Sequence, residues 1–138
     1  MKYLKDEHMR DADSGEEVQE STFLLEARLA ELRQHRAEVQ DPKSDAVADL
    51  FLEESRLLIR LQKMPEAWDA ARAAFDIYIA QENWQGAIEA CEVMYASDQP
   101  NSLPALGQGI WLSVTFPVDP ELTIAMLEHV VEETPDDS

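Results

Sequence analysis

Basic residues are scarce in this sequence. Its 138 residues include 11 lysines and arginines against 29 aspartates and glutamates, which gives a formal net charge of -18 at pH 7. Such a chain repels the phosphate backbone of a nucleic acid and the surface of an anionic membrane, so neither is expected as a partner. Two explanations for the acidity stay open: it keeps the protein in solution, or it attracts a basic protein or peptide.

Cysteine and long hydrophobic runs are also rare or missing. Cys91 is the only cysteine, which excludes an intrachain disulfide, and its place on an apolar helix face predicts a buried structural residue in a reducing compartment. No segment approaches the ~18 consecutive apolar residues that a membrane span requires. The N-terminus lacks the apolar centre of a signal peptide. We therefore expect a cytoplasmic protein.

Signatures of catalysis and metal binding are missing as well. The three histidines, His8, His35 and His129, are far apart and have no neighbour at metal-ligand spacing. Gly107-Gln108-Gly109 lies in a helical run without a preceding strand, which does not suit a phosphate-binding loop, and no nucleophile elbow is present. We expect a protein that is not an enzyme, with no catalytic residue, metal or cofactor.

Helical periodicity accounts for almost the whole chain after residue 19. The acid-rich segment 1–19 lacks periodicity and cannot bury enough apolar surface to offset the entropy of ordering, so we expect a flexible tail there. A single domain over residues 20–138 follows. No stretch alternates with a period of two, so the predicted class is all-α. The predicted helices span residues 23–39, 45–63, 65–80, 84–96, 103–116 and 122–133.

Local signals mark where these helices begin. Ser21, Ser44 and Asp119 can each accept hydrogen bonds from the exposed amides of a first turn. Pro65 and Pro120 suit a first turn, and proline disfavours helical geometry in the residue before it. The helix after Ser44 carries a broad apolar face, so we expect it to contact helices on two sides.

The segment from Pro65 to Pro100 carries the clearest pattern. Its first half places large and small apolar residues at i, i+3, i+7 and i+10 on one helical face: Trp68, Ala71, Phe75 and Tyr78. Its second half does the same with Trp84, Ala87, Ile88, Cys91 and Met94. Only residues 81–83 lie between the two halves, which is too short for anything but a tight antiparallel turn.

These residues resemble the tetratricopeptide repeat, a helix-turn-helix unit of about 34 residues. Tyr78, Trp84 and Ala87 match its aromatic and alanine positions. Alanine makes physical sense there, because two helices approach closely only where one lacks side-chain bulk. The chain also departs from the pattern: Phe75 stands where a small residue is usual, and Gln99 stands where the closing proline belongs.

The remaining helices match the repeat less well. Residues 103–135 have the length of a second unit, but Thr123 replaces the crossing alanine and Pro120 the aromatic. Residues 21–63 form a first hairpin by length and pattern alone. The resemblance implies about six helices in three antiparallel hairpins, stacked as a short right-handed superhelix. A simple antiparallel helix bundle stays open as the alternative.

The resemblance also implies a binding surface. In that family the first helix of each hairpin lines a concave groove, and the corresponding residues here are Asp69, Arg72, Asp76, Ile79, Gln108, Leu112, Thr115 and Phe116. Such a groove is acidic at one end and apolar at the other, so the implied partner is a basic and apolar peptide or helix. The expected function is that of an adaptor or assembly chaperone, similar to the small acidic helical-repeat chaperones of secretion systems.

The sequence also allows two other functions, and it does not determine the oligomeric state. An accessory subunit or small-molecule-binding bundle would line a pocket with Trp68, Trp84 and Trp111. A regulator that mimics nucleic acid would capture a basic DNA-binding protein. A stack of hairpins also needs its last apolar face covered, and no polar capping helix is evident at the C-terminus. We therefore expect a homodimer through the fifth or sixth helix, or a natural chain that continues past Ser138.

Overall fold

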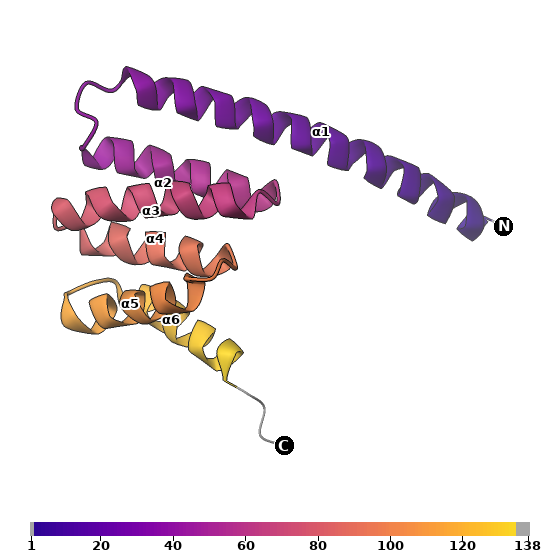
Figure 1. Cartoon of the computed structure of the whole chain (residues 1–138). Helices are drawn as coiled ribbons and strands as arrows, with labels where there is room; N and C mark the ends of the chain where they lie inside the picture. Colours follow the sequence, from indigo (N-terminus) through magenta and orange to yellow (C-terminus); the bar gives the residue numbers. More distant parts are fainter. Residues whose placement is uncertain (1, 135–138) are drawn as a thin grey trace.

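The computed structural model describes the backbone of residues 2–134 and the side chains of residues 19–134. Over these residues the chain forms six helices and no strand, which confirms the all-α prediction (Figure 1). The helices are α1 (Lys2–Glu38), α2 (Asp45–Arg60), α3 (Met64–Ala80), α4 (Trp84–Ala96), α5 (Ser102–Thr115) and α6 (Pro120–Glu133).

Consecutive helices pack against one another and form a stack from α1 to the pair α5 and α6 (Figure 1). In addition, α2 contacts α4, and α4 contacts α6. Within the described part of the chain, the backbones of α3 and α5 do not pack directly against each other. The even-numbered helices therefore lie closer together than α3 and α5 do, and hollows can open on the odd-numbered side.

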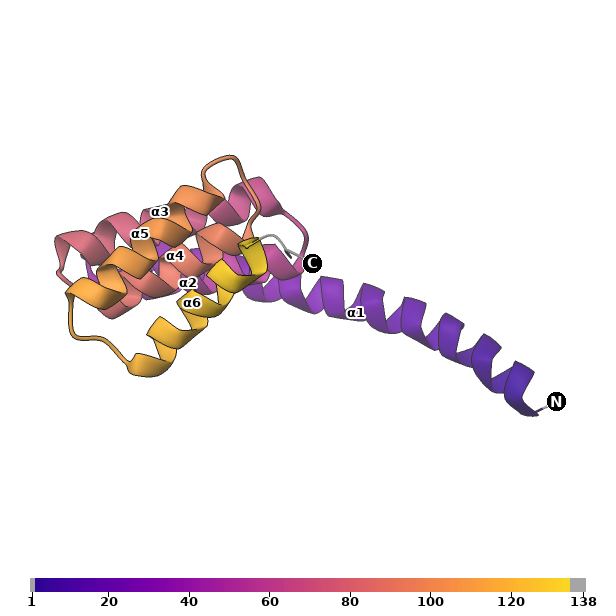
Figure 2. The ribbon, with the colours of Figure 1, turned by 90° about the horizontal axis from the view of Figure 1, so that it is seen from below.

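The first helix is longer than the sequence predicts. Its backbone is helical from Lys2, so Ser21 lies inside α1 and does not cap a helix as expected. Residues 2–22 contain no proline and many good helix formers, and a helix that extends beyond the bundle needs no apolar stripe to be helical (Figures 1 and 2). The flexibility predicted for residues 1–19 stays a prediction.

Tyr78 joins three helices in the core. Its ring packs on Gly86 so closely that a Cβ added there would lie 2.6 Å from the ring, and its hydroxyl donates a hydrogen bond to Asp49 of α2. Burial and the Asp49 carboxylate raise the pKa of Tyr78, so the phenol stays protonated. Ala87 is fully buried as expected, but its neighbour Gly86 is the residue that the Tyr78 ring covers.

A second glycine sets the spacing at the other end of the stack. A Cβ on Gly109 of α5 would lie 2.9 Å from the Cβ of Cys91 on α4, and would also collide with the side chain of Met126 on α6. Both of those side chains are buried. Gly109 therefore lets α4, α5 and α6 meet at one point, as small residues do at helix crossings.

The turns after α2 and α3 share one hydrogen-bond pattern. In the first, Gln62 N–H donates to Ile59 and Lys63 N–H to Leu58; in the second, Glu82 and Asn83 donate to carbonyls at the same offsets. This is the Schellman arrangement, which requires a left-handed residue just past the helix end. Gln62 and Glu82 adopt that conformation, with φ of 61° and 56°. The α2–α3 and α3–α4 turns therefore have the same backbone geometry.

Candidate functional site

A hollow opens between α3 and α5, and we call it the α3–α5 hollow. Its volume is about 170 Å³. It is lined by Trp68, Arg72, Met94, Asn101, Pro104, Ala105 and Gln108. Met94 belongs to α4 and is buried, so it forms the floor between the two flanking helices. Two of the predicted groove residues, Arg72 and Gln108, meet here although they come from different predicted hairpins.

The charge of Arg72 is already balanced within α3. Its Nε atom lies 3.2 Å from a carboxylate oxygen of Asp76, one helical turn further along, and its guanidinium lies 5.7 Å from the centre of the Phe75 ring. Both charged side chains are more than half exposed, so this pair contributes little to stability. The α3–α5 hollow therefore presents no unbalanced positive charge from α3.

A second hollow lies on the other side of α3. Its volume is about 260 Å³. It is lined by Arg33, Arg36, Phe51, Glu54, Leu58, Glu66, Asp69 and Ala70. Asp69 therefore lines a hollow shared with α1 and α2 and not the α3–α5 hollow, although it lies only three residues before Arg72 on α3. Asp76 lines a third hollow, together with Lys43, Ile77 and Ala80. The predicted groove residues that line a hollow are therefore divided among three hollows rather than gathered in one.

The other predicted groove residues take different places. Leu112 is only 2 % exposed and packs in the core, so its side chain is not open to a partner. Its apolar character matched a buried helix face as well as a groove, and the sequence pattern could not separate the two. Ile79 and Phe116 are half-buried against the core, and Thr115 is exposed.

The three tryptophans do not meet. The Trp84 ring stacks on the Phe116 ring with centroids 3.9 Å apart, and Trp111 meets the same Phe116 edge-on at 6.2 Å. Trp68 instead lines the α3–α5 hollow. Phe116 follows the last turn of α5 and holds the end of that helix against the start of α4.

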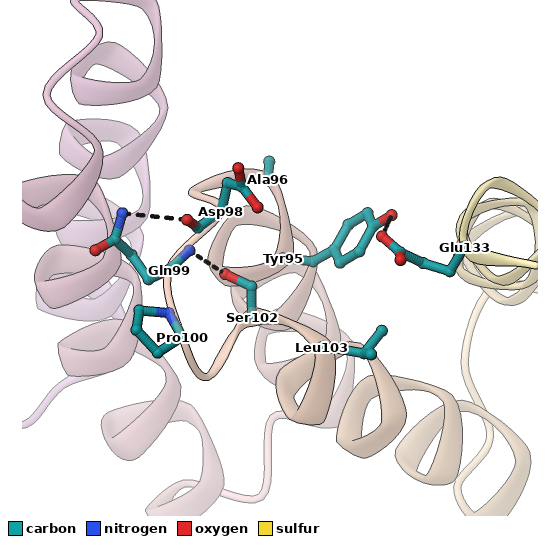
Figure 3. Close-up of a pocket in the computed structure, with 8 residues that line it drawn as sticks. All are labelled: Tyr95, Ala96, Asp98, Gln99, Pro100, Ser102, Leu103 and Glu133. Carbon is teal, nitrogen blue, oxygen red and sulfur yellow. Dashed lines mark hydrogen bonds between the residues drawn. The ribbon is translucent and has the colours of Figure 1, made fainter.

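A pocket that periodicity did not predict lies where α4, α5 and α6 come together (Figure 3). Its volume is about 350 Å³. Eight residues line it: Tyr95, Ala96, Asp98, Gln99, Pro100, Ser102, Leu103 and Glu133. We call it the Tyr95 pocket. The Tyr95 hydroxyl donates a 2.7 Å hydrogen bond to Glu133, and this bond raises the pKa of Tyr95 to about 12. Two carboxylates beside an aromatic ring and a leucine suit a cationic side chain with an aliphatic stem.

The exposed apolar side chains gather at the same end of the molecule. Among residues 19–134, nine large hydrophobic side chains are exposed, and seven of them belong to α5 and α6. We call these seven the terminal apolar face: Leu103, Trp111, Val114, Ile124, Leu127, Val130 and Val131. The helices α5 and α6 end the stack opposite α1 (Figures 1 and 2). An uncovered last face is what the sequence predicts for this end.

His129 anchors α6 on α4. Its Nε2 atom lies 3.2 Å from Glu92 of α4, its Nδ1 atom lies 3.1 Å from Glu132, and its ring lies against Tyr95. Burial lowers the pKa of His129, but the hydrogen bonds and charges of the two glutamates outweigh burial, and the net pKa is raised above 6.5. When it is protonated, the imidazolium of His129 bridges two carboxylates, one on α4 and one on α6.

The described residues form neither a metal site nor a membrane span. No group of three or more His, Cys, Asp or Glu side chains within residues 19–134 is arranged to hold a metal ion. None of the helices described between residues 2 and 134 has both the length and the apolar character needed to cross a membrane. No protein-family model, curated protein or solved structure gives a significant match to the chain.

Proposed function

We propose that this protein is a non-enzymatic interaction module, an adaptor or assembly chaperone, that holds a basic and apolar peptide or partner helix against α3 and α5. The single observation that carries the proposal is the α3–α5 hollow, where Arg72 and Gln108 meet over the buried Met94. The stacked helices would then serve the same purpose as those of the tetratricopeptide repeats that the chain resembles.

The chemistry of the hollow supports a ligand of this kind. Trp68 of α3 offers a large apolar and aromatic surface, and Gln108 and Asn101, in α5 and at its N-cap, can form hydrogen bonds with a ligand. Because Asp76 balances Arg72, the long-range field at the hollow is set by the -18 charge of the chain, which attracts a basic partner.

The rival function, a bundle that binds a small molecule among its tryptophans, has less support. Trp84 and Trp111 are used in packing around Phe116, and only Trp68 reaches the α3–α5 hollow. A volume of about 170 Å³ is also smaller than the roughly 300 Å³ at which small-molecule pockets begin. A shallow hollow between two helices suits one or two side chains of a peptide better.

The proposal is tested by selecting peptides from a random display library on the immobilised protein and mapping the selected peptide by amide chemical shifts. We expect enrichment of Lys, Arg and aromatic residues, and shifts centred on Trp68 and Gln108. The variant Gln108→Arg places a cation in the hollow and should weaken the selected peptide by roughly tenfold. Gln34→Arg adds the same charge at an exposed position on α1 and serves as its control.

Two results would contradict the proposal. One is a selected peptide whose shifts lie elsewhere on the stack. The other is equal weakening by Gln34→Arg and Gln108→Arg, because a general loss of attraction to an acidic protein would then explain the binding.

A further inference from the structure

The terminal apolar face is an uncovered surface at the end of a stack. On α5 its members follow helical spacing, because Leu103, Trp111 and Val114 are separated by eight and three residues and so share one side. On α6, Ile124, Leu127 and Val131 do the same at i, i+3 and i+7. Seven of the nine exposed large apolar side chains among residues 19–134 lie on two helices that pack together, and such a concentration is typical of interaction sites.

Apart from His129, the charged side chains around this face are all acidic. The helix α5 contains no charged residue at all. The charged residues at the start of α6 and along it are Asp119, Glu121, Glu128, Glu132 and Glu133, with His129 as the one basic group. No lysine or arginine follows Arg72 anywhere in the sequence. An apolar centre with a predominantly acidic rim is complementary to an apolar surface with a basic rim.

We propose that the terminal apolar face docks an amphipathic helix of another protein, one whose apolar stripe is flanked by lysines or arginines. A helix satisfies its own backbone hydrogen bonds, so it can cover apolar side chains without leaving polar groups unpaired. Its apolar residues at i, i+3, i+4 and i+7 pack on α5 and α6, as in other helix-in-groove complexes. Its cations then face the carboxylates of the rim.

The Tyr95 pocket extends this surface at one end. Leu103 belongs both to the terminal apolar face and to the pocket, and Glu133 of α6 forms its far wall (Figure 3). Asp98 adds a second carboxylate there. A lysine or arginine at one end of the docked helix can place its aliphatic stem on Leu103 and its charge between the two acids.

A second copy of this chain is the competing occupant, since the sequence predicts a homodimer through the C-terminal helices. A two-fold dimer brings the same patch of each copy together. The acidic rim of α6 would then face another acidic rim, and two chains of charge -18 would repel. The charges of this face therefore favour a basic partner over a second copy.

Docking at the terminal apolar face does not involve the α3–α5 hollow, because none of the residues that line that hollow belongs to the face. The two surfaces can be separated by substitution. Gln108→Arg alters only the hollow, so it should leave docking at the terminal apolar face unchanged.

The test measures fluorescence anisotropy with a labelled synthetic amphipathic helix of leucine and lysine, roughly 18 residues long, in about 0.15 M salt. A peptide of the same pattern with glutamate in place of lysine is the charge control. The protein variant Val114→Ser/Val131→Ser removes apolar surface from the face without changing charge. Phe23→Ser/Leu24→Ser removes the same kind of surface from α1, and the four side chains have matching exposures of 68 %, 73 %, 71 % and 66 %.

We expect the leucine–lysine peptide to bind the Val114/Val131 variant roughly tenfold more weakly than the parent, and the Phe23/Leu24 variant within about twofold. The leucine–glutamate peptide should not bind measurably. Circular dichroism melts identical to the parent's would show that both variants fold, as expected for exposed positions.

Four results would overturn the inference. Equal weakening by both double variants would show that the peptide binds exposed apolar side chains anywhere on the chain, and absence of weakening in both would show that it responds only to the net charge. Equal binding of the leucine–glutamate peptide would remove the role of the acidic rim. Light scattering that gives a dimer for the parent and a monomer for the Val114/Val131 variant would assign the face to a second copy.

Discussion

Arg36 of α1 donates two hydrogen bonds to the carboxylate of Glu54 on α2: Nε lies 2.6 Å from Oε2, and Nη2 lies 3.2 Å from Oε1. Arg33 adds a third bond at 3.2 Å. The Glu54 side chain is only 2 % exposed, whereas the arginines are 28 % and 47 % exposed. Arg36 also lies over the Phe51 ring, 4.0 Å from its centre. The longest helix is thus held to the stack by one buried acid between two partly solvated bases.

This asymmetry predicts unequal effects of substitution. Replacing both arginines by alanine leaves a buried carboxylate without a partner and should cost roughly 3–5 kcal/mol of unfolding free energy. Glu54→Gln leaves two arginines that water can still reach, so its cost should be roughly 1–3 kcal/mol. Urea unfolding measures both. Arg28→Ala removes only exposed ion pairs and should cost less than about 1 kcal/mol. A Glu54→Gln variant less stable than the double arginine variant would contradict this ordering.

The two glycines of α5 should respond in opposite ways to alanine. A Cβ at Gly107 meets nothing within 4 Å, so Gly107→Ala should stabilise the helix by about 0.5–1 kcal/mol. Gly109→Ala forces α4 and α6 away from α5 and should destabilise by roughly 1–3 kcal/mol. Thermal melts of the two variants are compared with that of the parent. Stabilisation by Gly109→Ala would refute the close crossing at Gly109, and destabilisation by Gly107→Ala would refute the open space at Gly107.

The thiol of Cys91 should be inert in the folded protein. Burial raises the pKa of Cys91 to about 12, and the nearby charge of Arg72 only partly offsets this. Since the thiolate is the reactive form, a disulfide reagent at pH 8 should label the native protein very slowly and the urea-unfolded protein at once. Rapid labelling under native conditions would mean that α5 separates from α4.

The attachment of α6 should weaken as the pH rises. The pKa of His129 is raised in the folded protein, so its contribution to stability is complete below the ordinary value of 6.5 and is lost as the pH passes through the raised native value. Hydrogen exchange of α6 amides, corrected for the intrinsic rate, should therefore show less protection at pH 8.5 than at pH 6. His129→Gln should abolish this difference, and a difference that persists in the variant would assign it to other groups.

Much of the helical architecture follows from local sequence signals. Ser44, Asn83 and Asp119 accept the hydrogen bonds expected of N-caps, so α2, α4 and α6 begin close to where the pattern predicts. The N-terminus of α1 could not be placed, because an exposed helix needs no apolar period. A run of good helix formers there is compatible with either a helix or a flexible tail.

The candidate surfaces were harder to predict than the helices. The burial of Glu54 depends on two arginines about twenty residues earlier in the chain, and periodicity gives no information on such pairings. The Tyr95 pocket forms only because α6 packs beside the end of α4. This is a tertiary contact, and local sequence patterns do not reveal it. Leu112 is predicted to line the groove but is buried. Periodicity places it on an apolar face of its helix, but it does not show which helix covers that face.

The matching turns at Gln62 and Glu82 have a consequence for the length of the molecule. Each reverses the chain direction with the same geometry, so a copy of two successive helices inserted at either turn would restore the original direction and the original connection. A single inserted helix would leave the following segment pointing the wrong way. Insertion at either of these turns therefore preserves the direction of the following helices only when the number of added helices is even.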